Sequence, residues 1–296
     1  MPKRVLTPSE AYQLRQALQL FTLDALMSAR RWGPSDLVFQ GGTSLHLAHG
    51  SPRFSEDLDF LVRRDVDPQQ MQRHLQATLE AQPWLPRDMR VTVKPAKAEH
   101  NPVALTVVLA GDDVVGAVRV KLELWKTPQS ALGGVRAFLA PVRLMSGPAA
   151  GAYAHVPTAE LEEIFADKVF ALAARDRLKP RDVFDLHFIA QSAPTLPRLS
   201  ADAMRIRFET YPGMSEDAWE FAARNRKAEL EGASHAIHED LVRWVPKTLP
   251  LGLRDVIAMV STASGGLVEG LDALTELRGE ATPRASIPTP CPCPCP

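Results

Sequence analysis

The chain has 296 residues, of which 45% are hydrophobic and 23% charged, and its formal net charge at pH 7 is −1. This length and composition are typical of a soluble globular protein with one large or two ordinary domains. The near-neutral charge excludes nucleic-acid binding through bulk charge, so any such contact requires a local basic patch.

Two further classes of protein are disfavoured by what the chain lacks. All three cysteines, Cys291, Cys293 and Cys295, lie at the C-terminal end, so the rest of the chain has neither a disulfide nor a thiolate metal site. The N-terminus has no apolar core of the signal-peptide type. The longest apolar run, residues 103–110, is far shorter than the roughly 20 residues of a membrane helix. We therefore expect a cytoplasmic protein that does not contact membranes.

The first predicted helix begins after Thr7. This residue can cap the helix, Pro8 suits the first helical position, and Glu10 lies three residues after the cap. Apolar residues then recur at helical spacing. Gly33 and Pro34 are expected to end the helix.

Strands and short helices follow. We predict a short apolar strand at residues 37–39, and a Gly-Gly turn that leads into a short helix at residues 44–48. A second strand is expected at residues 57–62. The next segment, residues 68–82, has the pattern of a helix and is closed by prolines.

Three β-like runs come next, at residues 90–94, 103–110 and 117–125. Gly111-Asp112-Asp113 between the last two predicts a hairpin-like turn. Residues 35–145 are therefore expected to form a small mixed sheet with helices.

Beyond Pro157 the pattern becomes helical. Thr158 is expected to cap a helix that runs to about residue 175, another helix is predicted at residues 181–189, and a further one begins after Ser215. The Pro-rich tail cannot form a helix or a central strand and is expected to be disordered. The predicted division is a sheet-bearing domain at residues 1–150, a helical domain at residues 151–282 and a tail at residues 283–296.

Two carboxylates are placed to act together. Residues two apart in a strand point to the same side, so Asp57 and Asp59 are expected to project together. A divalent cation relieves the repulsion between such groups, and Mg²⁺ fills its remaining positions with water and phosphate oxygens. Glu123 is the candidate third acid, on the polar face of its strand beside Lys121. The alternative is a half-exposed strand with a merely charged outer face.

Glycines and hydroxyls precede these acids. Gly41 and Gly42 would let the backbone approach a phosphate, and Thr43 and Ser44 would add hydroxyl donors. The alternative is an ordinary glycine turn capped by Ser or Thr. The segment is neither a P-loop nor a dinucleotide fingerprint, because the required lysine and glycine spacings are absent.

Lys168 falls within the apolar stripe of its predicted helix, so it must snorkel, pair with an acid or face a polar cleft. Asp182 and Asp185 lie in the first turn of the next helix, where acids favour the helix dipole. Basic residues gather at 205–207 and 224–227. They could meet RNA phosphates, although a solvated helix face accounts for them as well.

These motifs together resemble a known family. Gly41-Gly42-Thr43-Ser44-Leu45, followed by Arg53-Phe54-Ser55-Glu56-Asp57-Leu58-Asp59-Phe60, is similar to the AbiEii/AbiGii class of nucleotidyltransferase toxins, within the DNA-polymerase-β-like superfamily. Two further motifs of the family have counterparts in Ala166-Asp167-Lys168-Val169 and in Arg181-Asp182-Val183-Phe184-Asp185-Leu186. The resemblance covers roughly residues 35–190.

The resemblance implies an α/β (α+β) fold, in which residues 1–150 form a nucleotidyltransferase domain and the helical domain contributes to the active site. It also implies transfer of a nucleoside monophosphate from an NTP to an acceptor, with Mg²⁺ or Mn²⁺. Metal binding is expected at Asp57, Asp59 and Glu123, with Lys168 and Asp185 as further catalytic residues; Asp185 would act as a base or orient Lys168. The expected nucleotide-binding residues are Gly41, Gly42, Thr43, Ser44, Arg53, Ser55, Lys121 and Arg181.

By the same resemblance, the acceptor is RNA, with the 3′ end of tRNA as the expected target, and the physiological role is that of a type IV toxin. An antitoxin encoded alongside would be its companion and need not bind it directly. Two alternatives stay open. A small-molecule nucleotidyltransferase, such as one that modifies aminoglycosides, would use the same core and an acid-rich acceptor pocket. An inactive nucleotide- or protein-binding module would be expected to lack an acid, yet every candidate acid is present.

Overall fold

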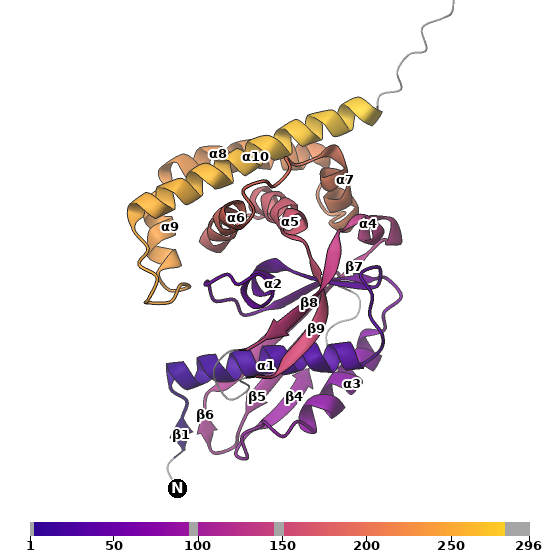
Figure 1. Ribbon diagram of the computed structural model, residues 1–296, viewed down its shortest axis with the longest axis vertical. Coiled ribbons are helices and arrows are strands. Elements are labelled where there is room, and N and C mark those ends of the chain that lie inside the picture. Colours follow the sequence, from indigo (N-terminus) through magenta and orange to yellow (C-terminus); the bar gives the residue numbers. More distant parts are fainter. Residues whose placement is uncertain (1–2, 95–99, 145–150, 282–296) are drawn as a thin grey trace, which may run out of the picture.

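The computed structural model describes residues 3–94, 100–144 and 151–281 of the chain (Figure 1). The Pro- and Cys-rich tail at residues 283–296 lies outside the described residues. Within the described ranges, every helix is too short or too polar to cross a lipid bilayer.

The N-terminal helix forms as the sequence predicts. In α1 (Pro8–Ser28), the Thr7 hydroxyl accepts a hydrogen bond from the backbone N–H of Glu10 at 3.2 Å. The helix ends before Gly33. Two short strands, β1 (Arg4–Val5) and β6 (Val114–Val115), pair in parallel beside it.

A mixed sheet forms the centre of the fold. Its order is β4-β5-β7-β3-β2-β9-β8, with parallel pairing of β3 with β7 and of β2 with β9, and antiparallel pairing elsewhere. The predicted strands and hairpin are present, and β4 and β5 have the predicted bounds. The strands of this sheet are β2 (Leu37–Gln40), β3 (Leu58–Arg63), β4 (Arg90–Lys94), β5 (Val103–Ala110), β7 (Ala117–Thr127), β8 (Ala137–Arg143) and β9 (Tyr153–Ala159).

The sheet continues past residue 150, where the sequence placed the domain boundary. Strand β9 pairs with β8 along its length and with β2 at Phe39, so it belongs to the sheet. Thr158 lies in β9 and donates its hydroxyl to the Val156 carbonyl at 2.9 Å, so it does not cap a helix. Glu160 is the N-cap residue of the next helix. We therefore propose a division near residue 160.

Helices cover both faces of the sheet. In Figure 1, α1 and α3 (Pro68–Glu80) lie on one side of the strands, and α5 to α10 gather on the other. Ser215 caps α8 by accepting a hydrogen bond from the N–H of Ala218, as predicted. The remaining helices are α2 (Gly41–Leu47), α4 (Gln129–Gly134), α5 (Leu161–Ala174), α6 (Pro180–Ser192), α7 (Ala201–Thr210), α8 (Glu216–Gly232), α9 (Ser234–Leu241) and α10 (Leu253–Ala281).

Two apolar cores result, because alternate residues of a strand face opposite sides. Phe39 and Phe60 belong to the core beneath α1 and α3, whereas Val38 and Leu61 belong to the core with α5. By the same alternation, Asp59 faces the side of Leu61. The strand end that carries Asp59 therefore points its carboxylate toward the helical part of the molecule.

Candidate active site

Asp59 and Glu123 occupy paired positions on neighbouring strands. In the parallel register of β3 and β7, Asp59 lies opposite Glu123, and in the antiparallel register of β2 and β3, Gln40 lies opposite Asp59. Asp57 lies one residue before β3. The sheet thus brings two of the predicted carboxylates, Asp59 and Glu123, to one level, as adjacent strands do for paired residues.

The carboxylates of Asp57, Asp59 and Glu123 lie close enough to repel one another. Burial, together with the negative charges of Glu123, Asp57 and Asp167, raises the pKa of Asp59 to about 7, although Lys168 opposes the shift. Burial and Glu123 also raise the pKa of Asp57, against Lys121 and Arg181. Both shifts mean that the ionised acids lack sufficient positive charge nearby.

Glycine allows the backbone to lie against these groups. Gly41 has φ of 79°, a left-handed conformation that favours glycine, and a Cβ there would be 2.5 Å from Asp59 Oδ2. A Cβ at Gly42 would collide with the guanidinium of Arg53 and lie 2.9 Å from Ser55 Oγ. Gly41 lines the cavity described below, whereas Gly42 makes room for Arg53 and Ser55.

The two hydroxyls after the glycines have backbone partners. Thr43 donates to the Asp57 carbonyl and Ser44 donates to the Gly41 carbonyl at 2.8 Å, and both side chains are buried. These bonds fix the chain that precedes Asp57 and the first turn of α2. The sequence predicts that these hydroxyls bind phosphate. In this structure they bind backbone carbonyls of the segment that carries the carboxylates.

Lys168 is held by two buried acids. Its Nζ lies 2.8 Å from Asp182 Oδ1 and 2.8 Å from Asp185 Oδ2. Burial lowers the pKa of Lys168, but Asp182 and Asp185 outweigh this effect and hold the pKa above its ordinary value. The sequence left three alternatives for this lysine: snorkelling, pairing with an acid or facing a polar cleft. The structure shows that it pairs with acids, and it also lines the cavity.

Arg53 completes this ionic cluster. Its Nε and Nη2 donate to the two oxygens of Asp185 at 2.7 and 2.8 Å, and both side chains are almost fully buried. Burial raises the pKa of Asp182, but Lys168 and Arg175 reverse the shift and lower it to about 2. The pKa of Asp185 is likewise lowered, since Lys168 and Arg53 outweigh its burial. The cluster therefore stays charged at neutral pH.

The other two predicted cationic residues lie apart from the cavity lining. Lys121 forms an ion pair with Glu123 and is 45% exposed. The guanidinium of Arg181 lies over the Trp244 ring, 4.1 Å from its centroid. Arg181 still acts on Asp57 electrostatically, because it opposes the rise in the pKa of that acid.

The basic stretches of the helical part are largely neutralised. Arg207 pairs with Glu163 in the interior at 2.9 Å, and Arg226 donates to the carbonyl of Leu172 at 2.9 Å. Arg224 pairs with Glu220 on the surface. These contacts favour a structural role for the stretches.

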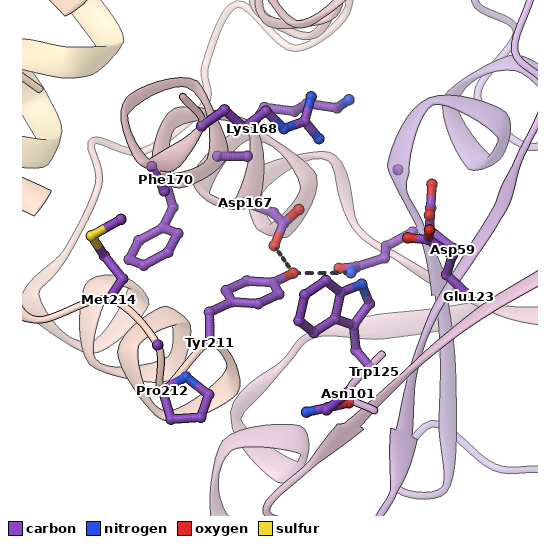
Figure 2. A pocket seen from close by; sticks show the side chains of 16 residues that line it. Asp59, Asn101, Glu123, Trp125, Asp167, Lys168, Phe170, Tyr211, Pro212 and Met214 are labelled. Carbon is purple, nitrogen blue, oxygen red and sulfur yellow. Dashed lines mark hydrogen bonds between the residues drawn. The ribbon is translucent and has the colours of Figure 1, made fainter. Parts of the chain in front are cut away.

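One cavity of about 470 Å³ opens onto Asp59 and Glu123 (Figure 2), whereas Asp57 is not among its lining residues. Asp59, Glu123 and Lys168 line it, together with residues from α5 and from the loop that follows α7. Its other principal lining residues, to which the sequence analysis assigned no role, are Gln40, Trp125, Asp167, Arg175 and Tyr211. Trp125 could have been found, because it follows Glu123 by two residues on the same polar face. Tyr211 gave no signal in the sequence, because it lies directly after α7 and far along the chain from the other site residues.

Hard carboxylate oxygens are the donors that Mg²⁺ and Mn²⁺ prefer. Asp57, Asp59 and Glu123 supply this donor type, and the raised pKa values of the two aspartates indicate a need for positive charge. No group of three His, Cys, Asp or Glu residues among the described ones is already arranged around a metal position. Mg²⁺ commonly takes only one or two protein carboxylates and completes its shell with phosphate and water. The donor set therefore fits such a cation.

Comparison with known proteins identifies similar chains. A family model described as "Nucleotidyl transferase AbiEii toxin, Type IV TA system" matches residues 25–248. The solved structure of JHP933 from Helicobacter pylori shares 18% identity, covers 93% of this chain and 96% of its own, and has a TM-score of 0.48. MenT4, a nucleotidyltransferase toxin from Mycobacterium tuberculosis H37Rv, shares 16% identity over 90% of this chain and 85% of its own, with a TM-score of 0.49. No curated protein matches the chain.

Proposed function

This chain belongs to the AbiEii nucleotidyltransferase toxin family, and on that premise we propose that it transfers a nucleoside monophosphate from an NTP to RNA. The 3′ end of tRNA would be the acceptor, and pyrophosphate would be released. The observation that carries the proposal is the register pairing of Asp59 with Glu123, at the wall of a cavity that Lys168 also lines. A cytoplasmic location and a companion antitoxin are part of the same proposal.

Asp57, Asp59 and Glu123 would hold Mg²⁺ or Mn²⁺. When bound, the cation would neutralise charge on the phosphates and help to orient the reacting oxygens. The raised pKa of Asp59 supports this assignment, because the partly buried carboxylate lacks a direct cationic partner among the described side chains. Glu123 would also be placed to accept the proton of the acceptor hydroxyl at a carboxylate oxygen.

Lys168 would contact the triphosphate from the opposite wall of the cavity. Asp182 and Asp185 hold its ammonium group in place, and a fixed cation costs no reorganisation when charge develops on the phosphates. Both oxygens of Asp185 accept hydrogen bonds from Arg53, and the side chain is fully buried. This supports an orienting role for Asp185 over a role as a base.

The remaining predicted residues would act at the edges of this site. Gly41 would let a phosphate approach the backbone, and Gly42, Thr43, Ser44, Arg53 and Ser55 would keep the carboxylates and Lys168 in position. Lys121 is half exposed and could turn from Glu123 to a phosphate. Arg181 would stabilise charge near Asp57.

One observation favours a second candidate, a small-molecule nucleotidyltransferase. Asp59, Glu123 and Asp167 all line the cavity, and an acid-rich pocket suits a cationic acceptor. Under the metal assignment, however, two of these three acids are occupied by the cation. The RNA acceptor is therefore the leading proposal.

Incubation with labelled NTPs, Mg²⁺ and total tRNA tests the proposal. Wild-type protein should label RNA, Asp59→Asn should not, and Asp112→Asn, which changes an exposed acid in a turn, should retain wild-type labelling. Label that appears on an aminoglycoside but not on RNA would favour the second candidate. RNA labelling that survives Asp59→Asn would remove the assigned mechanism.

A further inference from the structure

The cavity extends beyond the carboxylates into an aromatic lobe that the proposed chemistry does not use. We define the aromatic lobe by the side chains of Trp125, Phe170, Tyr211, Pro212 and Met214. Figure 2 shows the last four gathered at the end of the cavity away from Asp59 and Glu123, with Trp125 between the two groups. A ligand that fills the cavity would place one end at the carboxylates and the other among these rings.

Trp125 fixes the separation between the two ends. It follows Glu123 by two residues on β7, so both side chains project from the same face of the sheet, about 7 Å apart along the strand. In a nucleotide, the ribose separates the α-phosphate from the base by a similar span. A triphosphate at the carboxylates would therefore place its base beside Trp125.

Trp125 and Tyr211 form a corner suited to a flat ligand. Their ring centroids are 4.8 Å apart and their planes meet at 85°. Tyr211 is fixed in turn by stacking on Phe170, at 5.5 Å and 25°. A base that stacks on one ring of the corner presents its edge to the other, which is how aromatic side chains commonly hold bases.

A chain of hydrogen bonds ends at the same corner. The Tyr211 hydroxyl donates to Asp167 Oδ1 at 2.5 Å and accepts from Gln40 Nε2 at 3.2 Å (Figure 2). Burial and Asp167 hold the pKa of Tyr211 well above its ordinary value, so the phenol remains the donor. Within the described part of the chain, the second oxygen of Asp167 accepts no hydrogen bond. A carboxylate oxygen can only accept, so this partly buried oxygen is available to a donor group of the ligand.

We propose that the aromatic lobe binds the base of the donor NTP in the corner formed by Trp125 and Tyr211, and that Asp167 selects bases that carry an exocyclic amino group. This inference rests on the proposed function and adds a specificity site to it. Adenine, cytosine and guanine each offer such a donor. Uracil presents carbonyl oxygens in place of amino groups, and these would face the Asp167 oxygen unfavourably.

Calorimetric binding of the four NTPs and of inorganic triphosphate, without acceptor, tests the lobe separately from catalysis. For the wild type, the tightest ligand should be an NTP with an exocyclic amino group, and UTP and inorganic triphosphate should bind more weakly. Trp125→Ala should weaken binding of the preferred NTP by about 5- to 100-fold, the usual effect of losing one base–aromatic stack. Binding of inorganic triphosphate should not change, and this also reports that the variant is folded. Trp125→Phe should restore most of the affinity.

A matched control lies outside the cavity. Phe221 is 71% exposed on α8, so Phe221→Ala should leave every affinity unchanged. Asp167→Asn replaces an acceptor oxygen by an amide that can donate to a uracil carbonyl. The affinity for UTP relative to the preferred NTP should rise by about tenfold or more, as expected for one exchanged base contact.

The outcomes separate this inference from the proposed function. If the wild type binds inorganic triphosphate as tightly as any NTP, or if Trp125→Ala weakens both ligands equally, the lobe does not hold the base and the proposed function stands. If Asp167→Asn leaves the affinity for UTP relative to the preferred NTP unchanged, Asp167 does not select the base. A wild-type protein that binds neither triphosphate nor any NTP contradicts both proposals.

Discussion

Lys168 Nζ and Asp185 Oδ2 lie 2.8 Å apart in an ion pair that is buried from solvent. Lys168 comes from α5 and Asp185 from α6, and Arg53 binds the same carboxylate from the loop before β3. One acid therefore ties the helical part of the molecule to the segment that leads into Asp59. Breaking this connection should alter both the stability and the geometry of the site.

Replacing Lys168 by methionine should destabilise the fold strongly. The change keeps the volume of the side chain but leaves two buried carboxylates with less positive charge, and breaking a buried pair in this way typically costs about 3–5 kcal/mol. Urea unfolding measures the effect. Lys227→Met, which removes a half-exposed lysine 4.0 Å from Glu231, should change the free energy of unfolding by less than about 0.5 kcal/mol. Equal effects of the two variants would contradict the account.

Gly42→Ala should be costly because its neighbour cannot move freely. An added Cβ would meet the Arg53 guanidinium, which is fixed by its two bonds to Asp185. We expect a loss of about 1–3 kcal/mol, typical of overpacking in an interior. Gly133→Ala in α4 meets nothing within 4 Å and should be neutral or stabilising by up to about 1 kcal/mol. Thermal denaturation of both variants distinguishes a local clash from a general intolerance of alanine.

Lowering the pH should destabilise the fold because Asp182 becomes protonated. Its pKa is lowered from 3.8 to about 2 in the folded state, so its stabilising contribution is present above pH 3.8 and is lost as the pH falls from 3.8 toward 2. The contribution is on the order of 2 kcal/mol. Stability measured between pH 5 and pH 2 should fall less steeply in Asp182→Asn than in the wild type. Parallel curves for the two proteins would show that Asp182 does not carry this dependence.

Asp59 should make the stability of the fold depend on pH in the opposite direction. Its folded-state pKa of about 7 lies above the unfolded value of 3.8, so the metal-free protein should lose stability as the pH rises through this window. Asp59→Asn removes a partly buried charge that is repelled by Glu123, and should stabilise the metal-free protein at pH 8 by roughly 2–4 kcal/mol, with a smaller gain at pH 5. Denaturant unfolding at the two pH values tests this, with Asp112→Asn as the control. A destabilised Asp59→Asn protein at pH 8 would contradict the assigned environment.

Much of the sheet could be predicted because its strands carry local signals. Val118, Val120, Leu122 and Leu124 are buried and the residues between them are not, as the alternation indicates. Strands β8 and β9 were missed because Pro141 and Pro157 interrupt their patterns. Pro141 is tolerated on an edge strand, whose outward N–H groups need no partner. A threonine before an acidic helix start also looks like a cap, which misassigned Thr158.

The carboxylates and Lys168 could be proposed from sequence motifs, but their partners could not. The position of Asp182 in the first turn of its helix indicates only a favourable interaction with the helix dipole. That it binds Lys168 becomes visible only when α5 packs against α6. Tyr211 forms hydrogen bonds with Gln40 and Asp167, which lie in distant segments of the chain. No residue spacing in the sequence predicts these contacts. Local patterns therefore predicted which groups carry charge, whereas tertiary packing decides how each charge is held.

Mass spectrometry of tRNA after incubation with the protein, Mg²⁺ and the four NTPs tests the central claim most directly. We predict that the 3′-terminal fragment gains the mass of a nucleoside monophosphate with the wild-type protein and with Asp112→Asn, but stays unmodified with Asp59→Asn. Unmodified tRNA with the wild type, or the same mass gain with Asp59→Asn, would contradict transfer at the paired Asp59 and Glu123.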